Sequence, residues 1–491
     1  MGVVVAAIAL AIAACGGDSG EPVADAAPRP DAAPVADASA GIDAAPPDAA
    51  APDATACAAG TPCATNPSAP CRAGVTQCDT GAPVCADGDP VADGTACPAG
   101  TCVAGTCTLV VDAAVNLTAD ALVPGRSCAE APQYAVDQLT PEGAILATEV
   151  VDDCIVPGDE VLLINLQGAP DATVNVGNWE LLEVANVDRH QIAFASARTR
   201  SYGSAAGSDA DVGPEPGQQR VAVIRVPRYA HLVVTETGAI TAAAWDGATG
   251  GVVAFRADAV TVDGAITATD LGYRSGRWSR SDEQCDDSVQ TEAGESITGP
   301  AVAQVEANGG GPGGISALTN SSFHNDTPLS ATAGHATAGQ PGTNGRLRTL
   351  GPPGAAYGVG DGSRLTMGSG SGGNLTCDTT VTTPILVEAA PPAAGIVALF
   401  GGDITVGATG SITASARDAS RDTAASGGYV YLVGDDIALG DGRVTAKGAV
   451  AHGGALATAG MDIPASDGYV AIVAYGALSG TSDPPATVVT P

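Results

Sequence analysis

The pentapeptide GAITA occupies residues 238–242 and again residues 264–268, and close variants follow as GSITA at 410–414 and GRVTA at 442–446. Each copy begins with Gly, which suits a corner because it accepts positive φ without steric cost. The Ile or Val at the third position and the Ala at the fifth share one face of a strand, and the Thr between them lies on the other. The recurrence indicates one repeated structural unit with a buried and an outer face.

Two further pairs of apolar residues precede the pentapeptide in three of the copies. The aligned sets are Val253, Phe255, Val260, Val262, Ile266 and Ala268; Val397, Leu399, Ile404, Val406, Ile412 and Ala414; Val430, Leu432, Ile437, Leu439, Val444 and Ala446; and the single pair Val470 and Ile472. Three short strands per repeat are typical of a parallel β-helix or solenoid, in which like residues stack about 4.8 Å apart. The alternative is an antiparallel β-sandwich of similar strands.

The predicted repeats span residues 231–491 and are interrupted by a glycine-rich insertion at 272–394, which contains ANGGGPGG, GHATAGQPGTNG and GSGSGGN. We expect this insertion to leave the stack as a lateral loop tied by Cys285 and Cys377.

Residues 145–230 contain four strand-like runs separated by Gly, Pro and Asp turns, which predict a small β domain, and residues 109–144 are interpreted as a linker. The fold prediction is therefore all-β, with this small β domain followed by a right-handed parallel β-helix.

The N-terminus reads MGVVVAAIALAIAACGG, and its apolar run is too short to span a bilayer but fits the apolar core of a signal peptide. The run ends in Ile12-Ala13-Ala14-Cys15, which resembles the lipobox of bacterial lipoproteins. That resemblance implies that residues 1–15 form a lipoprotein signal and that Cys15 is diacylated, which would anchor the protein to a membrane. Because Gly16 is not acidic, we expect a surface-exposed protein of the outer membrane.

Residues 16–56 consist almost entirely of Ala, Asp and Pro and are predicted to form a disordered tether. At about 3.1 Å per residue in a polyproline-like conformation, such a tether could reach roughly 100 Å. The sequence thus predicts a domain held away from its anchor.

Residues 57–108 contain eight cysteines and almost no large apolar side chains, so they are predicted to form a disulfide-rich module. Zinc is the competing interpretation, but the C-x4-C spacings and the lack of His in this block do not fit paired C-x2-C ligands. Four more cysteines follow, and the even total favours disulfides throughout. The candidates are Cys57, Cys63, Cys71, Cys78, Cys85, Cys97, Cys102, Cys107, Cys128, Cys154, Cys285 and Cys377.

The chain carries 54 acidic and 20 basic residues, which gives a formal net charge of −34. This charge opposes binding to nucleic acid, so no such partner is expected. The sequence has no Walker A loop, H-E-x-x-H motif or G-x-S-x-G elbow, and no cofactor is predicted.

Few residues suggest catalysis. The five histidines are dispersed: His190, His231, His324, His335 and His452. His324 and His335 share the insertion and could approach one another, but they are interpreted as solvated loop residues. Asp435 and Asp436, if they lie in a strand, face opposite sides and cannot form a catalytic carboxylate pair. The other acidic doublet is Asp286 and Asp287, and the stretch DGDPVADG at 87–94 lacks the EF-hand spacing for calcium. Three tyrosines are expected to face outward from the repeat strands and could contact sugar: Tyr429, Tyr431 and Tyr469.

Longer stretches carry a family resemblance. These are PGDEVLLINLQG, WELLEVANVD, VIRVPRYAHLVV, ANGGGPGG and YGVGDGSRLTMGSGSGG. Together they cover about residues 145–475 and resemble the glycine-rich, adhesin-like surface proteins of Gram-negative soil bacteria. The Cys-rich block and its tether resemble the lipoprotein forms of this family.

The resemblance implies an extracellular, β-helix-like stalk with no established catalytic residues. The expected function is that of a non-enzymatic cell-surface lipoprotein for adhesion or for envelope or matrix structure. Its expected partners are the membrane, through the lipid anchor, and extracellular polysaccharide or other cell-surface components. The alternative is a β-helical polysaccharide lyase or glycoside hydrolase.

Overall fold

The chain divides into two units, Met1–Ala56 and Cys57–Pro491. The computed structural model describes residues 59–63, 69–78, 83–98, 100–151, 153–281, 290–317, 329–343, 348–377, 385–387, 390–418, 423–452 and 462–490. Several predictions concern residues outside these ranges: Cys15, the tether at 16–56, Cys57, Cys285, Asp286, Asp287 and His324. Within the ranges all regular elements are strands, which confirms the all-β class, and no helix is long and apolar enough to cross a membrane.

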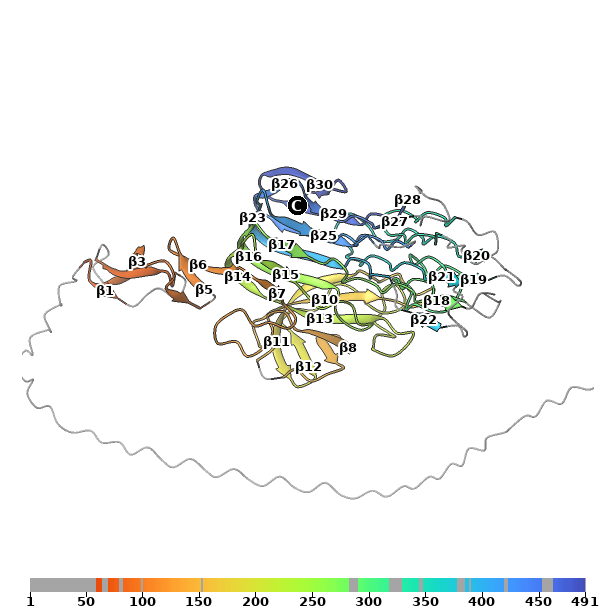
Figure 1. Cartoon of the computed structure of the whole chain (residues 1–491). Coiled ribbons are helices and arrows are strands. Elements are labelled where there is room, and N and C mark those ends of the chain that lie inside the picture. Colours follow the sequence, from red (N-terminus) through yellow and green to blue (C-terminus); the bar gives the residue numbers. More distant parts are fainter. Residues whose placement is uncertain are drawn as a thin grey trace, which may run out of the picture. The chain divides into compact units, whose positions relative to one another are not determined.

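A large sheet of 15 strands contains the predicted repeats (Figure 1). One row of parallel strands consists of β6 (Thr106–Val111), β14 (Arg228–Val234), β16 (Val252–Val262), β23 (Ile396–Val406), β25 (Tyr429–Gly434), β29 (Tyr469–Ala474) and β31 (Thr487–Val489). A second row consists of β7 (Ala114–Asn116), β15 (Ala239–Thr241), β17 (Ala265–Thr267), β24 (Ser411–Thr413), β26 (Ile437–Thr445) and β30 (Leu478–Asp483). The repeats therefore pair in parallel, and the antiparallel alternative is wrong.

The predicted apolar columns are register partners in this sheet. Val253 pairs with Val397, Val397 with Val430, and Val430 with Val470. The isoleucines of the pentapeptides also pair with one another, as Ile266 does with Ile412. All of these residues belong to one buried cluster, which confirms the predicted stacking of like on like.

The prediction of a linker at 109–144 is wrong. Strand β6 pairs with β14 and places Leu109 and Val111 in the buried cluster, and β7 pairs with β15. The apolar alternation of TCTLVV at 106–111 buries one face of the strand, so these residues extend the stack toward the N-terminus.

A closed barrel packs against this sheet, and its first strand begins at Gln133, before the small β domain predicted from residue 145. Its strands are β8 (Gln133–Thr140), β9 (Gly143–Leu146), β10 (Glu160–Gln167), β11 (Trp179–Asp188), β12 (Gln191–Phe194) and β13 (Arg220–Val226). Strand β10 is buried along most of its length because alternate residues face the barrel interior and the large sheet.

The predicted disulfide-rich module contains β1 (Pro62–Cys63), β2 (Arg72–Gln77), β3 (Val84–Pro90), β4 (Ala96–Cys97) and β5 (Gly100–Val103). Its disulfides join Cys63 to Cys85, Cys71 to Cys102 and Cys97 to Cys107, and Cys78 is also disulfide-bonded. The sulfur atoms of Cys71, Cys97 and Cys107 lie within 4.8 Å of one another, but two disulfides take them up. Strand β5 pairs antiparallel with β6, so the module shares β6 with the large sheet.

The insertion at 272–394 is not a lateral loop, which corrects the prediction. Its Leu365 and Met367 are fully buried and pack, together with the barrel, on the outer face of β16, β23 and β25. The short strands in and beside this region are β18 (Trp278–Ser281), β19 (Ile315–Ala317), β20 (Arg348–Leu350), β21 (Leu375–Cys377), β22 (Ile385–Val387), β27 (Val450–His452) and β28 (Asp462–Pro464).

Between these short strands the insertion runs as extended segments joined by backbone hydrogen bonds, and we call it the glycine-rich bundle. Gly354 N donates to Thr332 O at 3.1 Å, and Gly339 N donates to Gly354 O at 2.9 Å. A Cβ atom added at Gly354 would lie 1.7 Å from the carbonyl oxygen of Gly310, so a side chain cannot fit there. Glycine lets these backbones touch, which explains the composition of the insertion.

Candidate functional site

The tyrosines that were expected to face solvent are instead covered by the glycine-rich bundle. Tyr429 is fully buried, and its hydroxyl accepts a hydrogen bond from Gly362 N and donates one to Val359 O, both at 2.9 Å. Tyr469 is half-buried, and its hydroxyl donates to Tyr357 O at 2.9 Å. Their direction away from the apolar columns was predicted correctly, but the layer that covers them was not.

The described histidines do not form a catalytic group. His190 contacts Leu146 O, His231 is half-buried in β14, and the exposed His452 lies 2.9 Å from Asp462 Oδ1. His335 contradicts the prediction of a solvated loop residue, because it is completely buried in the glycine-rich bundle.

His335 lies in a closed polar and aromatic cluster. Its Nδ1 donates to Gly427 O at 2.7 Å, which fixes the tautomer, and its Nε2 accepts from Thr366 Oγ1 at 2.8 Å. The rings of Tyr357 and Tyr469 lie 4.5 and 5.0 Å from the imidazole. Burial lowers the pKa of His335 to about 4, so the neutral imidazole is a structural group at neutral pH.

The acidic residues named from the sequence do not converge. Asp435 and Asp436 lie in the bend between β25 and β26 rather than in a strand, and both are exposed. Asp436 Oδ1 accepts a hydrogen bond from Ala477 N at 2.6 Å, which gives this carboxylate a turn-stabilising role. In the 87–94 stretch, Asp93 Oδ1 likewise accepts from Ala104 N at 2.8 Å.

A cleft of about 320 Å³ lies where the barrel meets the large sheet. Strands β10, β11 and β13 line it from the barrel, and β14 and β16 line it from the sheet. Its charged lining residues are Asp159, Glu160, Glu183, Arg225, Arg228 and Arg256. Its apolar lining residues are Leu181, Leu182 and Val226. The cleft therefore combines positively and negatively charged hydrogen-bonding groups with an apolar part of its lining, and we take it as the candidate site.

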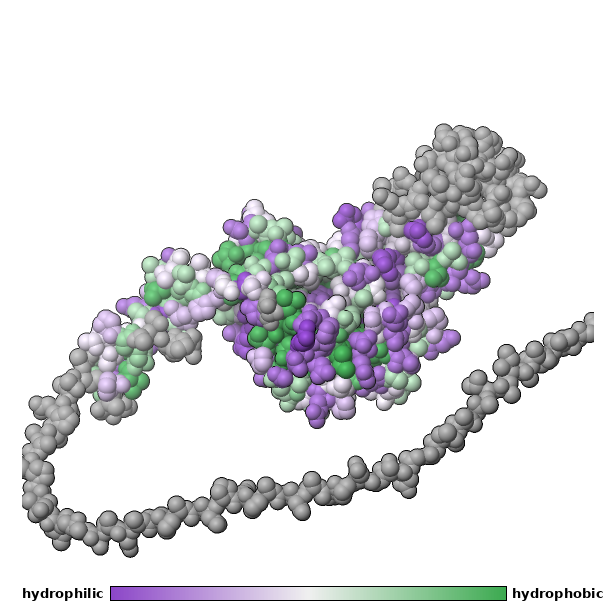
Figure 2. Space-filling view, turned by 90° about the horizontal axis from the view of Figure 1, so that it is seen from below, coloured by the Kyte–Doolittle hydropathy of each residue, from purple (hydrophilic) through white to green (hydrophobic). Residues whose placement is uncertain are grey.

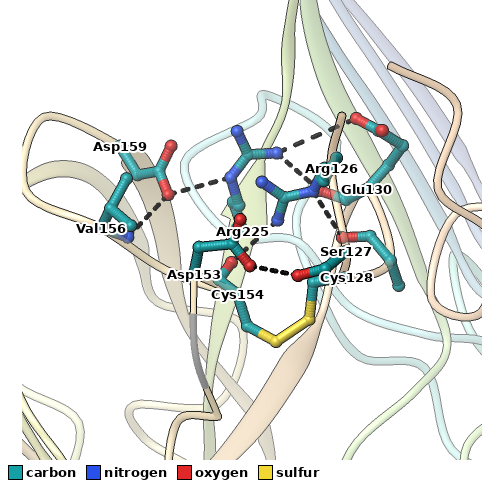
Figure 3. The surroundings of a disulfide bond; sticks show 10 residues. Arg126, Ser127, Cys128, Glu130, Asp153, Cys154, Val156, Asp159 and Arg225 are labelled. Carbon is teal, nitrogen blue, oxygen red and sulfur yellow. Dashed lines mark hydrogen bonds and ion pairs between the residues drawn. A yellow bond between two sulfur atoms is a disulfide. The ribbon is translucent and has the colours of Figure 1, made fainter. Parts of the chain in front are cut away.

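Arg225 forms one wall of the cleft and is held from several sides (Figure 3). Its Nε lies 3.0 Å from Asp159 Oδ2, and its Nη1 donates to the backbone oxygen of Glu130 at 2.8 Å. Asp159 Oδ2 also accepts from Val156 N at 2.9 Å. These contacts fix both the guanidinium and the carboxylate at the edge of the cleft.

The Cys128–Cys154 disulfide lies behind this wall (Figure 3). It joins the segments that carry Glu130 and Asp159, and Arg126 adds a hydrogen bond to Cys154 O at 2.9 Å. Burial and the nearby charge of Arg225 lower the pKa of Arg126. Both cysteines were among the sequence candidates, and their disulfide connects the two segments that hold Arg225.

The opposite wall is an ion pair between the barrel and the sheet. Arg256 donates from Nε and Nη2 to the two carboxylate oxygens of Glu160, at 2.8 and 2.7 Å. The hydrogen bond with Glu160 raises the pKa of Arg256. Beside this pair, the exposed Arg228 contacts Asp258 at 3.1 Å. Because both partners of the Arg256–Glu160 pair are partly exposed, the pair orients the groups more than it stabilises the fold.

Aromatic residues continue from this wall along the outer face of the sheet. The guanidinium of Arg256 lies 5.6 Å from the ring centroid of Phe400. Trp179 follows, with its ring 5.8 Å from that of Phe400 and 5.4 Å from that of Tyr431. Phe400 and Tyr431 are buried, so Trp179 is the partly exposed member of this aromatic group.

Sequence reasoning missed the cleft, although one signal was present. Arg225 interrupts RVAVIRV, an otherwise apolar run that becomes β13. A charge inside such a run needs a partner, so it could have marked the wall of a site. Its partner Asp159 lies 66 positions earlier in the chain (225 − 159), and no local pattern connects the two.

No family model and no curated protein matches this chain. Among solved structures, the tailspike gp61 of Pseudomonas phage phi297 aligns at 13% identity with a TM-score of 0.15. The alignment covers 77% of this chain, which spans 56% of the tailspike. A TM-score of this size does not establish a shared fold.

Proposed function

We propose that this chain is a non-enzymatic, lipid-anchored protein of the outer cell surface that serves in adhesion or in envelope structure. Its large sheet coils as a parallel β-helix, right-handed as parallel crossovers usually are. The in-register rows that β16 and β23 make with their neighbours support this architecture. Like residues then stack on like, as in other solenoids.

The observation that carries the proposal is the continuity of β6 between the disulfide-rich module and the large sheet. Stapling by disulfides is typical of exported proteins. The disulfide-rich module follows the predicted tether in the sequence and precedes the stack. Strand β6 therefore connects the anchored side of the chain to the domain that the anchor would display. Such an arrangement suits a displayed stalk.

Membrane fractionation tests the anchor. We expect Cys15→Ala to move the protein from the membrane fraction to the soluble fraction, because an apolar run of this length cannot hold it without lipid. Ser19→Ala, four positions further on, is the matched control and should remain with the membrane. Retention of Cys15→Ala in the membrane fraction would show that the proposed anchor is wrong.

The non-enzymatic part is tested with the purified protein and a panel of polysaccharides. No new reducing ends or unsaturated products should appear during long incubation. If they appear, and if Asp435→Asn or Asp436→Asn abolishes their release without unfolding the protein, the glycoside hydrolase or lyase alternative replaces the proposal.

A further inference from the structure

We propose that the cleft between barrel and sheet, together with the adjoining ring of Trp179, binds an uncharged polysaccharide. This inference rests on the proposed function for where the protein would meet such a ligand, namely at the cell surface. The binding itself depends only on the folded cleft.

The charges of the cleft favour a neutral ligand. Three carboxylates and three guanidinium groups line it, so their formal charges cancel. The chain as a whole carries a net charge of −34, which repels acidic polymers at a distance. A sugar hydroxyl can donate to a carboxylate and accept from a guanidinium, so a lining of both kinds matches a ligand rich in hydroxyls.

Donor capacity remains after the internal ion pairs have formed. Arg256 uses Nε and Nη2 for Glu160, and no hydrogen bond of its Nη1 occurs among the described residues. Arg228 contacts Asp258 through Nη2 alone, and its side chain is 70% exposed. Since guanidinium carries five N–H groups, both arginines retain donors for a ligand.

Apolar surface adjoins these donors. Leu181 and Leu182 line the cleft, and Trp179 lies two residues before Leu181 on the same face of β11. Trp179 is partly exposed, and its Nε1 donates to Gly362 O at 2.9 Å, which fixes the ring. The C–H faces of sugar rings are apolar enough to pack on such a ring. Trp179 thus extends the cleft by one apolar surface, and the buried Phe400 and Tyr431 pack against its ring from behind.

The site is also preorganised. Its walls come from strands of the barrel and of the large sheet. Arg225 is fixed by Asp159 and by the backbone oxygen of Glu130, which lies in a segment held by the Cys128–Cys154 disulfide. The Arg225 side chain therefore has little freedom left to lose when a ligand binds. A volume of about 320 Å³ lies at the lower end of the range for small-ligand sites, which suits a short stretch of a chain rather than a large ligand.

The test measures retardation of the full-length protein in native gels that contain dextran, laminarin or galactomannan, with alginate and polygalacturonate as acidic probes. We expect retardation by at least one neutral polymer and none by the acidic polymers. Arg228→Ala should weaken the binding about tenfold, the effect of losing a hydrogen bond to a charged group. Trp179→Ala should weaken it at least as much, and Trp179→Phe should restore part of the loss.

The matched control is Arg189→Ala, because Arg189 is an exposed barrel arginine that pairs with Glu149 at 2.8 Å away from the cleft. It should bind as the unchanged protein does. Circular dichroism verifies that each variant is folded, and since Arg228 is exposed its substitution gives a test free of unfolding. The proposal is overturned if no neutral polymer binds, if only acidic polymers bind, or if Arg228→Ala and Arg189→Ala behave alike. Failure of the Cys15 test would leave these results unchanged, so the two proposals fail separately.

Discussion

The large sheet and the glycine-rich bundle solve the same packing problem in opposite ways. In the sheet, columns of Val, Ile and Leu such as Val397, Val430 and Val470 fill the interior, and the backbones keep the ordinary strand spacing. In the bundle, backbones touch at glycines, and polar groups such as His335 and Asn308 are buried with hydrogen-bond partners. The apolar columns leave no room for an unpaired charge, whereas the bundle leaves no room for a side chain at glycines such as Gly354.

The largest effect is expected in the sheet. Leu432 is fully buried in the apolar columns, and Leu432→Asp would bury a charge without a partner, at a cost of several kcal/mol. Chemical denaturation should show a free energy of unfolding lowered by about 4 kcal/mol or an unfolded protein. Thr405→Asp places the same group on the exposed face of β23 and should change stability by less than about 0.5 kcal/mol. Equal losses in the two variants would refute the assignment of the inner face.

The next effect concerns buried polarity in the bundle. The pKa of His335 is about 4 in the folded protein and about 6.5 when unfolded, so the unfolded state binds more protons between these values. Stability should therefore fall as pH falls from 6.5 to 4, by about 3 kcal/mol in total. Chemical denaturation at pH 7 and pH 4.5 measures this fall in the free energy of unfolding. In His335→Gln the side chain at position 335 cannot titrate, so the fall should be limited to the contribution of other groups. A fall of the same size in His335→Gln would contradict the assignment.

A smaller effect is expected where backbones touch. Gly354→Ala adds a Cβ atom against the carbonyl oxygen of Gly310, and the bundle must move apart to accommodate it. We expect a loss of about 1–3 kcal/mol, the usual cost of overpacking. Ala355 is exposed and its substitution by Gly should cost no more than about 1 kcal/mol. Thermal denaturation of both variants checks the difference, and an unchanged melting temperature for Gly354→Ala would disprove the close contact.

The smallest effect on the sheet is expected from the disulfide-rich module. Replacing Cys63 and Cys85 together by Ser removes the cross-link between β1 and β3 and should loosen that region, which has little apolar core. The large sheet has its own buried cluster and should unfold at an unchanged temperature. Hydrogen exchange resolves the two regions. Faster exchange in β16 and β23 would show that the module and the sheet fold as one unit.

The same contrast explains how much could be predicted. The columns were predictable because apolar pairs recur with constant spacing, and that spacing became the register of β16, β23 and β25. The burial of His335 was not predictable, because it depends on Gly427 and Thr366, which no local periodicity connects to it. The prediction of solvent-facing tyrosines was wrong for the same reason. The alternation along each strand predicts which way a side chain points, but it does not predict that the glycine-rich bundle covers that face.

For the cleft, the charged residue inside the β13 run was visible in the sequence, but the partners that make a site of it come from distant strands. Arg225 of β13 contacts Asp159, which directly precedes β10, and Arg256 of the large sheet contacts Glu160 of the barrel. The first pair depends on the pairing of β10 with β13 inside the barrel, and the second depends on the packing of the barrel against the sheet. No local sequence pattern records either arrangement.

The sharing of β6 between module and sheet also has a mechanical consequence. If the anchor side of the chain is pulled along β6, tension reaches all four register pairs that join Thr108–Val111 of β6 to His231–Val234 of β14 together. The hydrogen bonds between β6 and β14 lie across the pulling direction, so they bear the load together. The hydrogen bonds of a hairpin that is pulled open from its end break one after another. We therefore expect single-molecule pulling from the N-terminal side to open the pairing of β1 with β2 at low force and to detach β6 only at a higher one. The disulfides within the module would limit how far the chain lengthens between the two events.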